Sequence, residues 1–199
     1  MRKTRFQAMQ DRMALRFPQI SGLAQSMETD YEALCRQCAH YPESFQRHLH
    51  NNIPPVVSAF HVLLDSGMDR PAAAEAASDV FLEMMEEIAA QLRHMLKLPG
   101  LYRLMPRIWK TMMPRLFSPD SGFAFSFHPT DGRQVKFDMT ACPYYQACLE
   151  LDCLELAPTF CTTDDVCYGH MHPRLIWNRT RTIARGADVC DFDLYIPKR

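Results

Sequence analysis

The chain has 199 residues, of which 22 are basic and 23 acidic, giving a net charge of −1. Hydrophobic residues make up 47% and charged residues 23%, the balance of an ordinary globular protein. This length suffices for one domain with its own core and would crowd two, so we expect a single domain over residues 1–199. The near-zero charge argues against nucleic acid as the main partner, and it permits a homo-oligomer without requiring one.

The sequence lacks the patterns of export and of membrane insertion. Residues 1–5 are basic, but no run of about 7–15 apolar residues follows them, as a secretory signal would require. No stretch approaches the roughly 20 apolar residues of a membrane helix. We therefore expect a cytoplasmic protein without an integral membrane segment, whose eight cysteines are reduced.

The apolar pattern predicts that the N-terminal part, residues 1–117, is helical. A helix is expected over 27–41, with acidic residues in its first turn. Pro54 is expected to stop a helix, so the next one is placed at 56–64. The longest predicted helix spans 71–98, and its apolar stripe has helical spacing: Val80, Met84, Ile88, Leu92 and Met95.

The segment 101–117 mixes apolar and basic side chains in a way that suits an amphipathic helix. Pro106 and Pro114 are expected to break it into short pieces, which argues against a membrane-surface helix. We favour a packed helical segment whose methionine and tryptophan side chains line the core or a ligand pocket.

The period changes to that of strands after residue 120. Alternating phenylalanines and an Asp-Gly turn predict a hairpin over 123–140. Two more strands are expected at 175–183 and 189–196, and two short helices at 143–155 and 163–169 lie between the hairpins.

The fold class that follows is α+β. Residues 120–197 are expected to carry the site in a ββααββ order, with an antiparallel sheet and helices on one face. The helical residues 1–117 are expected to pack with this C-terminal part.

Side chains suited to catalysis gather between residues 142 and 191, which hold six of the eight cysteines. Cys142 is expected at a helix N-terminus, followed by Pro143 in the first turn. The helix dipole and the free amide donors there would depress its pKa, which makes it a candidate nucleophile. The alternative is a thiol that only fills space in the core.

The other cysteines do not have the spacing of a metal site. Cys148 and Cys153 follow Cys142 too distantly, because zinc ligands usually come as Cys-x-x-Cys pairs. Cys35 and Cys38 form one such pair, but no second pair accompanies it. We therefore expect no metal and no cofactor.

Cys161 precedes two carboxylates, Asp164 and Asp165. A thiol and two acids would cluster at the entrance of the predicted helix 163–169, and His172 follows closely enough to serve as a general base. The alternative is structural, with a threonine capping the helix and both acids in its first turn.

Cys190 and Asp191 are expected to open the last strand, on opposite faces of the sheet. Arg179, with Arg181 and Arg185 from the neighbouring strand, could bind a substrate carboxylate bidentately. Alternatively, these arginines pair with nearby aspartates on a solvated strand face.

Three motifs stand out when the C-terminal part is read as a whole. They are Cys142-Pro143-Tyr144-Tyr145, Phe160-Cys161 with Asp164-Asp165, and Arg179-Thr180-Arg181-Thr182 with Gly186 and Cys190-Asp191-Phe192. Taken together they resemble the L-2-amino-thiazoline-4-carboxylic acid hydrolase family, over about residues 120–196. Asp193 departs from the pattern, because the family often has a basic or aromatic residue there.

The resemblance implies ring-opening hydrolysis of a cyclic amidine, such as 2-amino-thiazoline-4-carboxylate to N-carbamoyl-cysteine. Either a thiolate attacks the amidine carbon, or a carboxylate or imidazole activates water. Arg179 would bind the substrate carboxylate, with Thr182 and Asp165 beside it. The residues expected to catalyse are Cys142, Cys161, Asp164, Cys190, Asp191 and His172.

Two other classes of function remain open at this point. One is a metal-binding or redox-sensing module that uses Cys142, Cys161 and Cys190 as thiolate ligands. The other is a non-catalytic domain whose segment 101–117 holds an apolar ligand.

Overall fold

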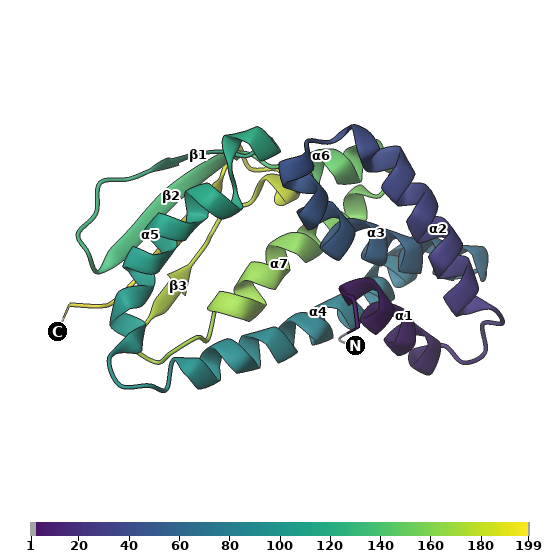
Figure 1. Cartoon of the computed structure of the whole chain (residues 1–199), viewed down its shortest axis with the longest axis horizontal. Helices are drawn as coiled ribbons and strands as arrows, with labels where there is room; N and C mark the ends of the chain where they lie inside the picture. Colours follow the sequence, from purple (N-terminus) through teal and green to yellow (C-terminus); the bar gives the residue numbers. More distant parts are fainter. Residues whose placement is uncertain (1–2, 199) are drawn as a thin grey trace.

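The computed structural model describes residues 3–198 and begins with four helices that share one core (Figure 1). The helix predicted at 27–41 begins earlier and ends at Gln37, where a 3₁₀ turn, η1, follows. The elements are α1 (Arg5–Arg16), α2 (Leu23–Gln37), η1 (Cys38–His40), α3 (Glu43–Asp65) and α4 (Arg70–Met95).

Helix α3 runs through Pro54 and Pro55, so the predicted break is wrong, although the helix at 56–64 is confirmed. Pro54 has no N–H to donate to the carbonyl of His50, one turn earlier. The hydroxyl of Tyr31 donates to that carbonyl instead, at 3.3 Å. Both prolines are buried, so core packing compensates for the missing helix hydrogen bond.

Helix α4 fills most of the predicted range 71–98, and the side chain of Asp69 caps its N-terminus. Only the first part of the predicted apolar stripe is buried. Val80 and Met84 lie in the core, whereas Met95 is 54% exposed. The second half of α4 extends beyond the cluster of α1 to α3 (Figure 1), which leaves Ile88 and Met95 exposed.

The segment 101–117 forms the 3₁₀ turn η2 (Leu101–Leu104) and one continuous helix, α5 (Met105–Leu116). The expected fragmentation is therefore wrong. Pro106 lies in the first turn, where no helix hydrogen bond is lost, and Pro114 lies in the last turn. No helix in the described part of the chain is long and apolar enough to cross a bilayer.

The C-terminal part contains a four-stranded antiparallel sheet in the order β1-β2-β4-β3. Buried and more exposed residues alternate along β2 and β4, as the sequence period predicted. Helix α5 packs on this sheet (Figure 1), with Trp109 against Trp177 at 5.3 Å between ring centres. The α+β class and the hairpin at 123–140 are confirmed. The strands are β1 (Ala124–Phe127), β2 (Gln134–Ala141), β3 (Ile176–Asn178) and β4 (Cys190–Tyr195).

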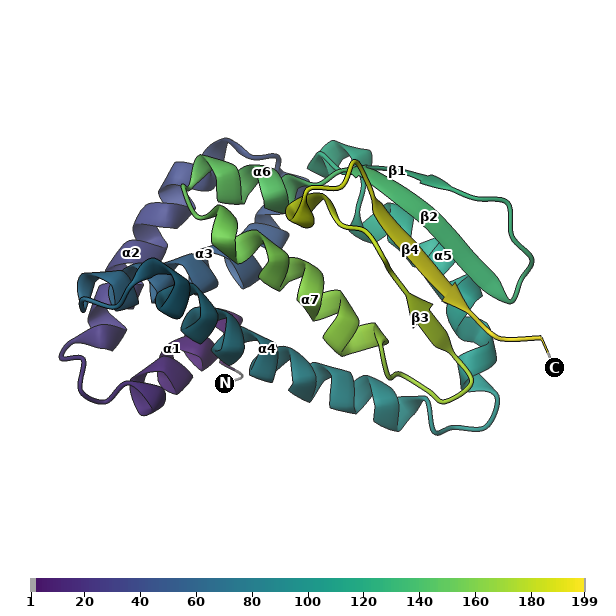
Figure 2. The same cartoon turned by 180° about the vertical axis from the view of Figure 1, so that it is seen from behind.

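Two helices connect the hairpins, α6 (Pro143–Glu150) and α7 (Ala157–Tyr168). The helix predicted at 143–155 therefore ends sooner. The one predicted at 163–169 begins at Ala157, because Pro158 suits its first turn. Figure 2 shows α7 between the helical cluster and the sheet, where it can contribute side chains to both.

The strand predicted at 175–183 is cut short, because β3 ends at Asn178. The carboxylate of Asp191 accepts the N–H groups of Thr180 at 2.8 Å and Arg181 at 2.6 Å, which draws the chain out of the sheet ladder. A 3₁₀ turn, η5 (Ile183–Arg185), follows. The assignment of residues 1–199 to one domain stays a prediction.

Candidate functional site

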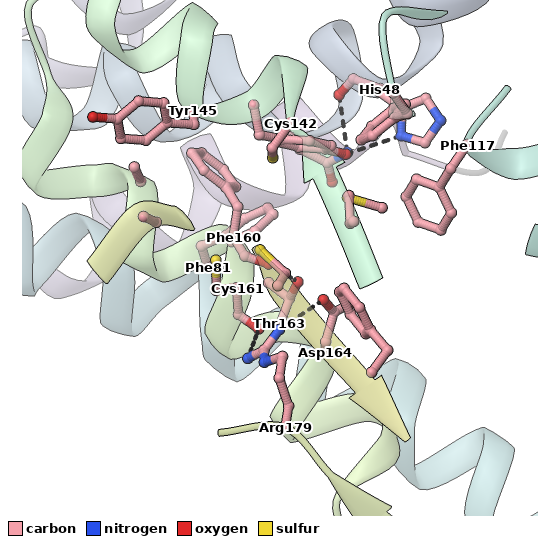
Figure 3. Close-up of a pocket in the computed structure, with 18 residues that line it drawn as sticks. His48, Phe81, Phe117, Cys142, Tyr145, Phe160, Cys161, Thr163, Asp164 and Arg179 are labelled. Atoms are coloured by element: carbon pink, nitrogen blue, oxygen red, sulfur yellow. Dashed lines mark hydrogen bonds and ion pairs between the residues drawn. The ribbon is translucent and has the colours of Figure 1, made fainter. Parts of the chain in front are cut away.

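One cavity of about 180 Å³ lies where α3, α6, α7 and the sheet meet (Figure 3). Its walls are mostly apolar with a few polar groups, which is typical of a site for a small organic ligand. The aromatic side chains that line it include Phe81, Phe117, Phe123, Tyr144, Phe160 and Phe192.

Five predicted site residues line this cavity: Cys142, Cys161, Asp164, Arg179 and Cys190. They come from the junction between β2 and α6, from α7, and from the two sides of the loop between β3 and β4. Figure 3 shows Asp164 and Arg179 together at one end, with Cys142 nearer the other.

Arg179 is buried and engages both neighbouring carboxylates. Its Nη1 donates to Asp164 Oδ2 at 3.0 Å, and its Nη2 donates to Asp165 Oδ2 at 2.6 Å. The same Nη2 also donates to the Cys161 carbonyl at 2.8 Å. The Arg179 side chain is only 2% exposed, and the protein's own acceptors engage both N–H groups of Nη2 and one of Nη1.

The two aspartates lie in the second half of α7, whereas the sequence placed them in a first turn. Asp164 faces the cavity, and Asp165 accepts the indole N–H of Trp177 at 2.9 Å. The helix dipole does not favour carboxylates near a C-terminus. The positive charge of Arg179 supplies the stabilisation that the dipole does not.

The carboxyl group of Asp164 titrates unusually. Its pKa is raised to about 7, chiefly because burial disfavours the ionised form; Arg179 opposes this rise and the charge of Asp165 adds to it. A carboxyl group with this pKa can accept or donate a proton near neutral pH.

Cys161 and Cys190 form a hydrogen-bonded thiol pair between α7 and β4. The Cys190 sulfur accepts the N–H of Ile183 at 3.2 Å, and its interaction with the Cys161 thiol also favours its ionised form. These two interactions lower the pKa of Cys190 even though the residue is buried. The hydrogen bond to Cys190, together with burial, raises the pKa of Cys161. The backbone N–H at its sulfur makes Cys190 the thiol of this pair whose ionised form the structure stabilises better.

Cys142 occupies the predicted position at the start of α6, with Pro143 after it. The expected depression of its pKa is wrong. Burial raises its pKa to about 11 and outweighs the hydrogen bonds from the backbone N–H groups of Tyr145 and Tyr144. Cys142 thus faces the cavity as a neutral thiol.

Four other predicted site residues lie outside the cavity lining. Asp165 holds Arg179, and Asp191 holds the turn after β3. Thr182 is buried, and its hydroxyl has no hydrogen-bond partner within the described residues. His172 stacks on Tyr102 at 4.1 Å between ring centres, and burial lowers its pKa.

The sequence reasoning missed a polar wall formed by His48, Asn52 and Tyr144. Asn52 Nδ2 donates to the Tyr144 oxygen at 2.8 Å, and the Tyr144 hydroxyl lies 3.0 Å from His48 Nδ1. His48 Nε2 lies 2.9 Å from the Leu116 carbonyl. Because a carbonyl only accepts, Nε2 carries the proton and Nδ1 accepts from Tyr144. The pKa of His48 is lowered by burial, which favours this neutral form.

The only sequence signal for this wall was the i, i+4 spacing of His48 and Asn52. That signal was hidden, because a helix was expected to stop at Pro54 and the segment before it received no assignment.

The cysteines do not assemble with other ligands into a metal site. Within residues 3–198, no three His, Cys, Asp or Glu side chains converge closely enough to hold a metal ion. All eight cysteines are free thiols.

A family model described as L-2-amino-thiazoline-4-carboxylic acid hydrolase matches residues 56–194, well over half of the chain. The match includes Cys142, Cys161, Asp164 and Cys190. The chain belongs to this family.

The match to the L-2-amino-thiazoline-4-carboxylic acid hydrolase family begins within α3. It therefore starts earlier in the chain than the resemblance based on motifs, which covered about residues 120–196. It takes in α4, α5 and all of the sheet except Tyr195. His48 and Asn52 precede it, so the polar wall joins the family region to the N-terminal helices.

Comparison with solved structures finds only remote likenesses. The H-NOX domain from Shewanella oneidensis in the Fe(II)CO ligation state is 11% identical, covers 100% of both chains and has a TM-score of 0.36. The Fe(II) unliganded H-NOX protein from K. algicida is 9% identical, covers 98% of this chain and 96% of its own, and has a TM-score of 0.30. Identities and TM-scores this low support no conclusion about the function of this chain. No curated protein matches the chain.

Proposed function

We propose that this protein opens a small cyclic amidine by hydrolysis, breaking the bond between a ring sulfur and the amidine carbon. One observation carries the proposal. Cys190, whose pKa is lowered, shares an apolar cavity with Asp164, whose pKa is about 7. A nucleophile and an acid–base group in one largely apolar site suit covalent hydrolysis.

Asp164 binds the amidine. An ionised carboxylate can accept two N–H groups from an amidinium, a charge-assisted and directional contact. Protonation of the ring nitrogen makes the amidine carbon more electrophilic. Arg179 fixes the orientation of the carboxylate through its 3.0 Å hydrogen bond.

Cys190 attacks the amidine carbon as a thiolate. A bond forms between its sulfur and that carbon, and the bond from the carbon to the ring sulfur breaks. The ring sulfur leaves as a thiol by taking up the proton that Cys190 gave up. One thiol replaces another, so this exchange needs no strong driving force.

Water then releases the product. Ionised Asp164 accepts a proton from a water molecule whose oxygen bonds to the same carbon, and the bond from that carbon to Cys190 breaks. That proton passes to the departing Cys190 sulfur, and the second proton of the water moves to the substrate nitrogen as the urea carbonyl forms. One water is consumed and the product is a urea that carries a thiol. From 2-amino-thiazoline-4-carboxylate, this product is N-carbamoyl-cysteine.

The remaining predicted residues fit supporting roles. Cys161 stabilises the Cys190 thiolate by its S–H donor, and Asp165 holds Arg179. Catalysis by Cys142, Asp191 or His172, and substrate binding by Thr182, stay predictions.

The test is hydrolysis of 2-amino-thiazoline-4-carboxylate in water enriched in oxygen-18. We expect one heavy oxygen in the urea product, and a covalent adduct on Cys190 after acid quenching. Cys190→Ala should form neither. Cys35→Ala, a half-buried thiol of α2 outside the cavity, is the matched control and should keep both. Full turnover by Cys190→Ala would contradict the proposal.

A further inference from the structure

We infer that the cavity selects cyclic amidines that carry an apolar substituent and discriminates against those that carry a carboxylate. This substrate class rests on the hydrolysis proposed above. It departs from the acid that the family description names, and it follows from the charges and the walls of the cavity.

The first argument is the lack of an available cation. Among the described residues that line the cavity, Arg179 is the only lysine or arginine. Its fork is already engaged by Asp164, Asp165 and the Cys161 carbonyl. A substrate carboxylate would have to share this guanidinium with two aspartates that already balance its charge.

The charge balance at this end of the cavity also favours a cationic ligand over one with a carboxylate. Arg179 contributes one positive charge, and Asp164 and Asp165 contribute two negative charges when both are ionised, so the cluster is net negative. It becomes neutral only when Asp164 is protonated. An amidinium is therefore attracted by ionised Asp164, whereas a carboxylate is repelled or forces Asp164 to take up a proton.

The opposite end supplies no cation either. Both ring nitrogens of His48 are engaged, one with the Tyr144 hydroxyl and one with the Leu116 carbonyl. Protonation of Nδ1 would break the hydrogen bond from Tyr144, and burial already lowers the pKa of His48. This wall remains neutral at neutral pH.

The space between the two ends is walled by aromatic rings. Phe81, Phe123 and Phe192 line it and are themselves nearly inaccessible to solvent. An apolar ring substituent would bury its surface against them. A carboxylate in the same place would lose hydration without gaining a partner, which costs free energy.

A pair of amidines that contain no ring sulfur tests the ligand class without turnover. Benzamidine offers an amidinium on an apolar ring, and 4-carboxybenzamidine adds only a carboxylate. Calorimetry at pH 7.5 should show benzamidine binding at least about tenfold more tightly. Binding of benzamidine should also release protons, because the bound cation lowers the pKa of Asp164. Equal or tighter binding of 4-carboxybenzamidine would overturn the inference.

Turnover of three thiazolines separates this inference from the proposed function. They are 2-amino-thiazoline with a 4-phenyl group, with a 4-carboxylate and with neither. We expect the highest kcat/KM for the phenyl compound. Highest kcat/KM for the carboxylate would overturn the inference but support hydrolysis. If none reacts while benzamidine is still preferred, hydrolysis is contradicted and the ligand class stands.

A charge variant sharpens the test. Asp165→Asn removes one negative charge and frees part of the Arg179 fork, so 4-carboxybenzamidine should gain affinity about tenfold and benzamidine should not. The matched control is Asp152→Asn, at a fully exposed side chain with a positive φ that asparagine tolerates. An unchanged ratio of the two affinities in Asp165→Asn would contradict the charge argument.

Discussion

Two pairs of hydrogen-bonded cysteines lie in the C-terminal part, and they differ in what surrounds them. Cys148 and Cys153 are fully buried, and the hydrogen bond between the thiols together with burial raises the pKa of Cys148. In the second pair, Cys190 accepts from the Cys161 thiol and also from the backbone N–H of Ile183, and its pKa is lowered.

The comparison shows what makes a thiol available for chemistry. Among the contacts of these four cysteines within residues 3–198, only the Cys190 sulfur accepts a backbone N–H in addition to its partner thiol. In the first pair, the N–H of Cys153 donates to the Cys148 carbonyl, not to a sulfur. Cys190 also lines the cavity, whereas Cys148 does not. Between these two pairs, the backbone donor at the sulfur and the adjoining cavity distinguish Cys190 from Cys148.

Replacing one cysteine of each pair with alanine should give the largest difference in kcat/KM between the two pairs. We expect Cys190→Ala to lower kcat/KM on the order of 10³-fold or more, because the nucleophile is lost. Cys148→Ala should change kcat/KM by less than about threefold but destabilise the fold by about 1–2 kcal/mol, because it leaves a small cavity. Steady-state kinetics and urea unfolding check both. The opposite pattern would mean that the roles of the two pairs are reversed.

The next largest effect concerns Asp164. In the wild type, kcat/KM for an amidinium substrate should rise with pH through about 7, because only the ionised carboxylate binds the cation. Asp164→Asn should lower kcat/KM by roughly 10²–10⁴-fold and remove this rise. The measurement is a pH profile from 5 to 9 for both proteins, with Asp152→Asn as the control. A variant profile that still rises through pH 7 would assign the titration to another group.

The sequence predicted the sheet and the cavity residues better than the helix boundaries, for physical reasons. Alternating apolar residues place Phe137 and Phe192 on a buried face whatever surrounds them. The helix break predicted at Pro54 is absent, because the missing hydrogen bond is compensated by the hydroxyl of Tyr31, which is distant in the sequence. The helix predicted at 163–169 was placed too late, and the first part of α7 from Ala157 was missed, because the residues before Asp164 lack an apolar period.

The electrostatics were less predictable than the positions. Cys142 was placed correctly at a helix N-terminus, but the extent of its burial, which sets its pKa, depends on the whole fold. Spacing also could not reveal that Asp164 and Asp165 share Arg179, or that Ile183 donates to a sulfur. Such contacts form between segments that only the tertiary structure brings together.

The smallest predicted effect concerns the polar wall. Tyr144→Phe removes the hydroxyl that joins Asn52 to His48, and we expect it to destabilise the fold by about 1–3 kcal/mol. Turnover should fall only a few-fold, because the wall does not carry the proposed chemistry. Tyr145→Phe is the control, since its hydroxyl makes no hydrogen bond within residues 3–198. Urea unfolding of the two variants measures the difference, and equal stabilities would contradict the described network.

The most direct test of the account is alkylation of the folded protein by iodoacetamide at graded pH, with each cysteine quantified by peptide mass spectrometry. We predict that Cys190 reacts with a midpoint below about 8.5, the pKa of a free cysteine. Cys148 and Cys153 should stay protected until the protein unfolds. If Cys142 has the lowest midpoint, or if Cys190 reacts only after unfolding, Cys190 is not the nucleophile.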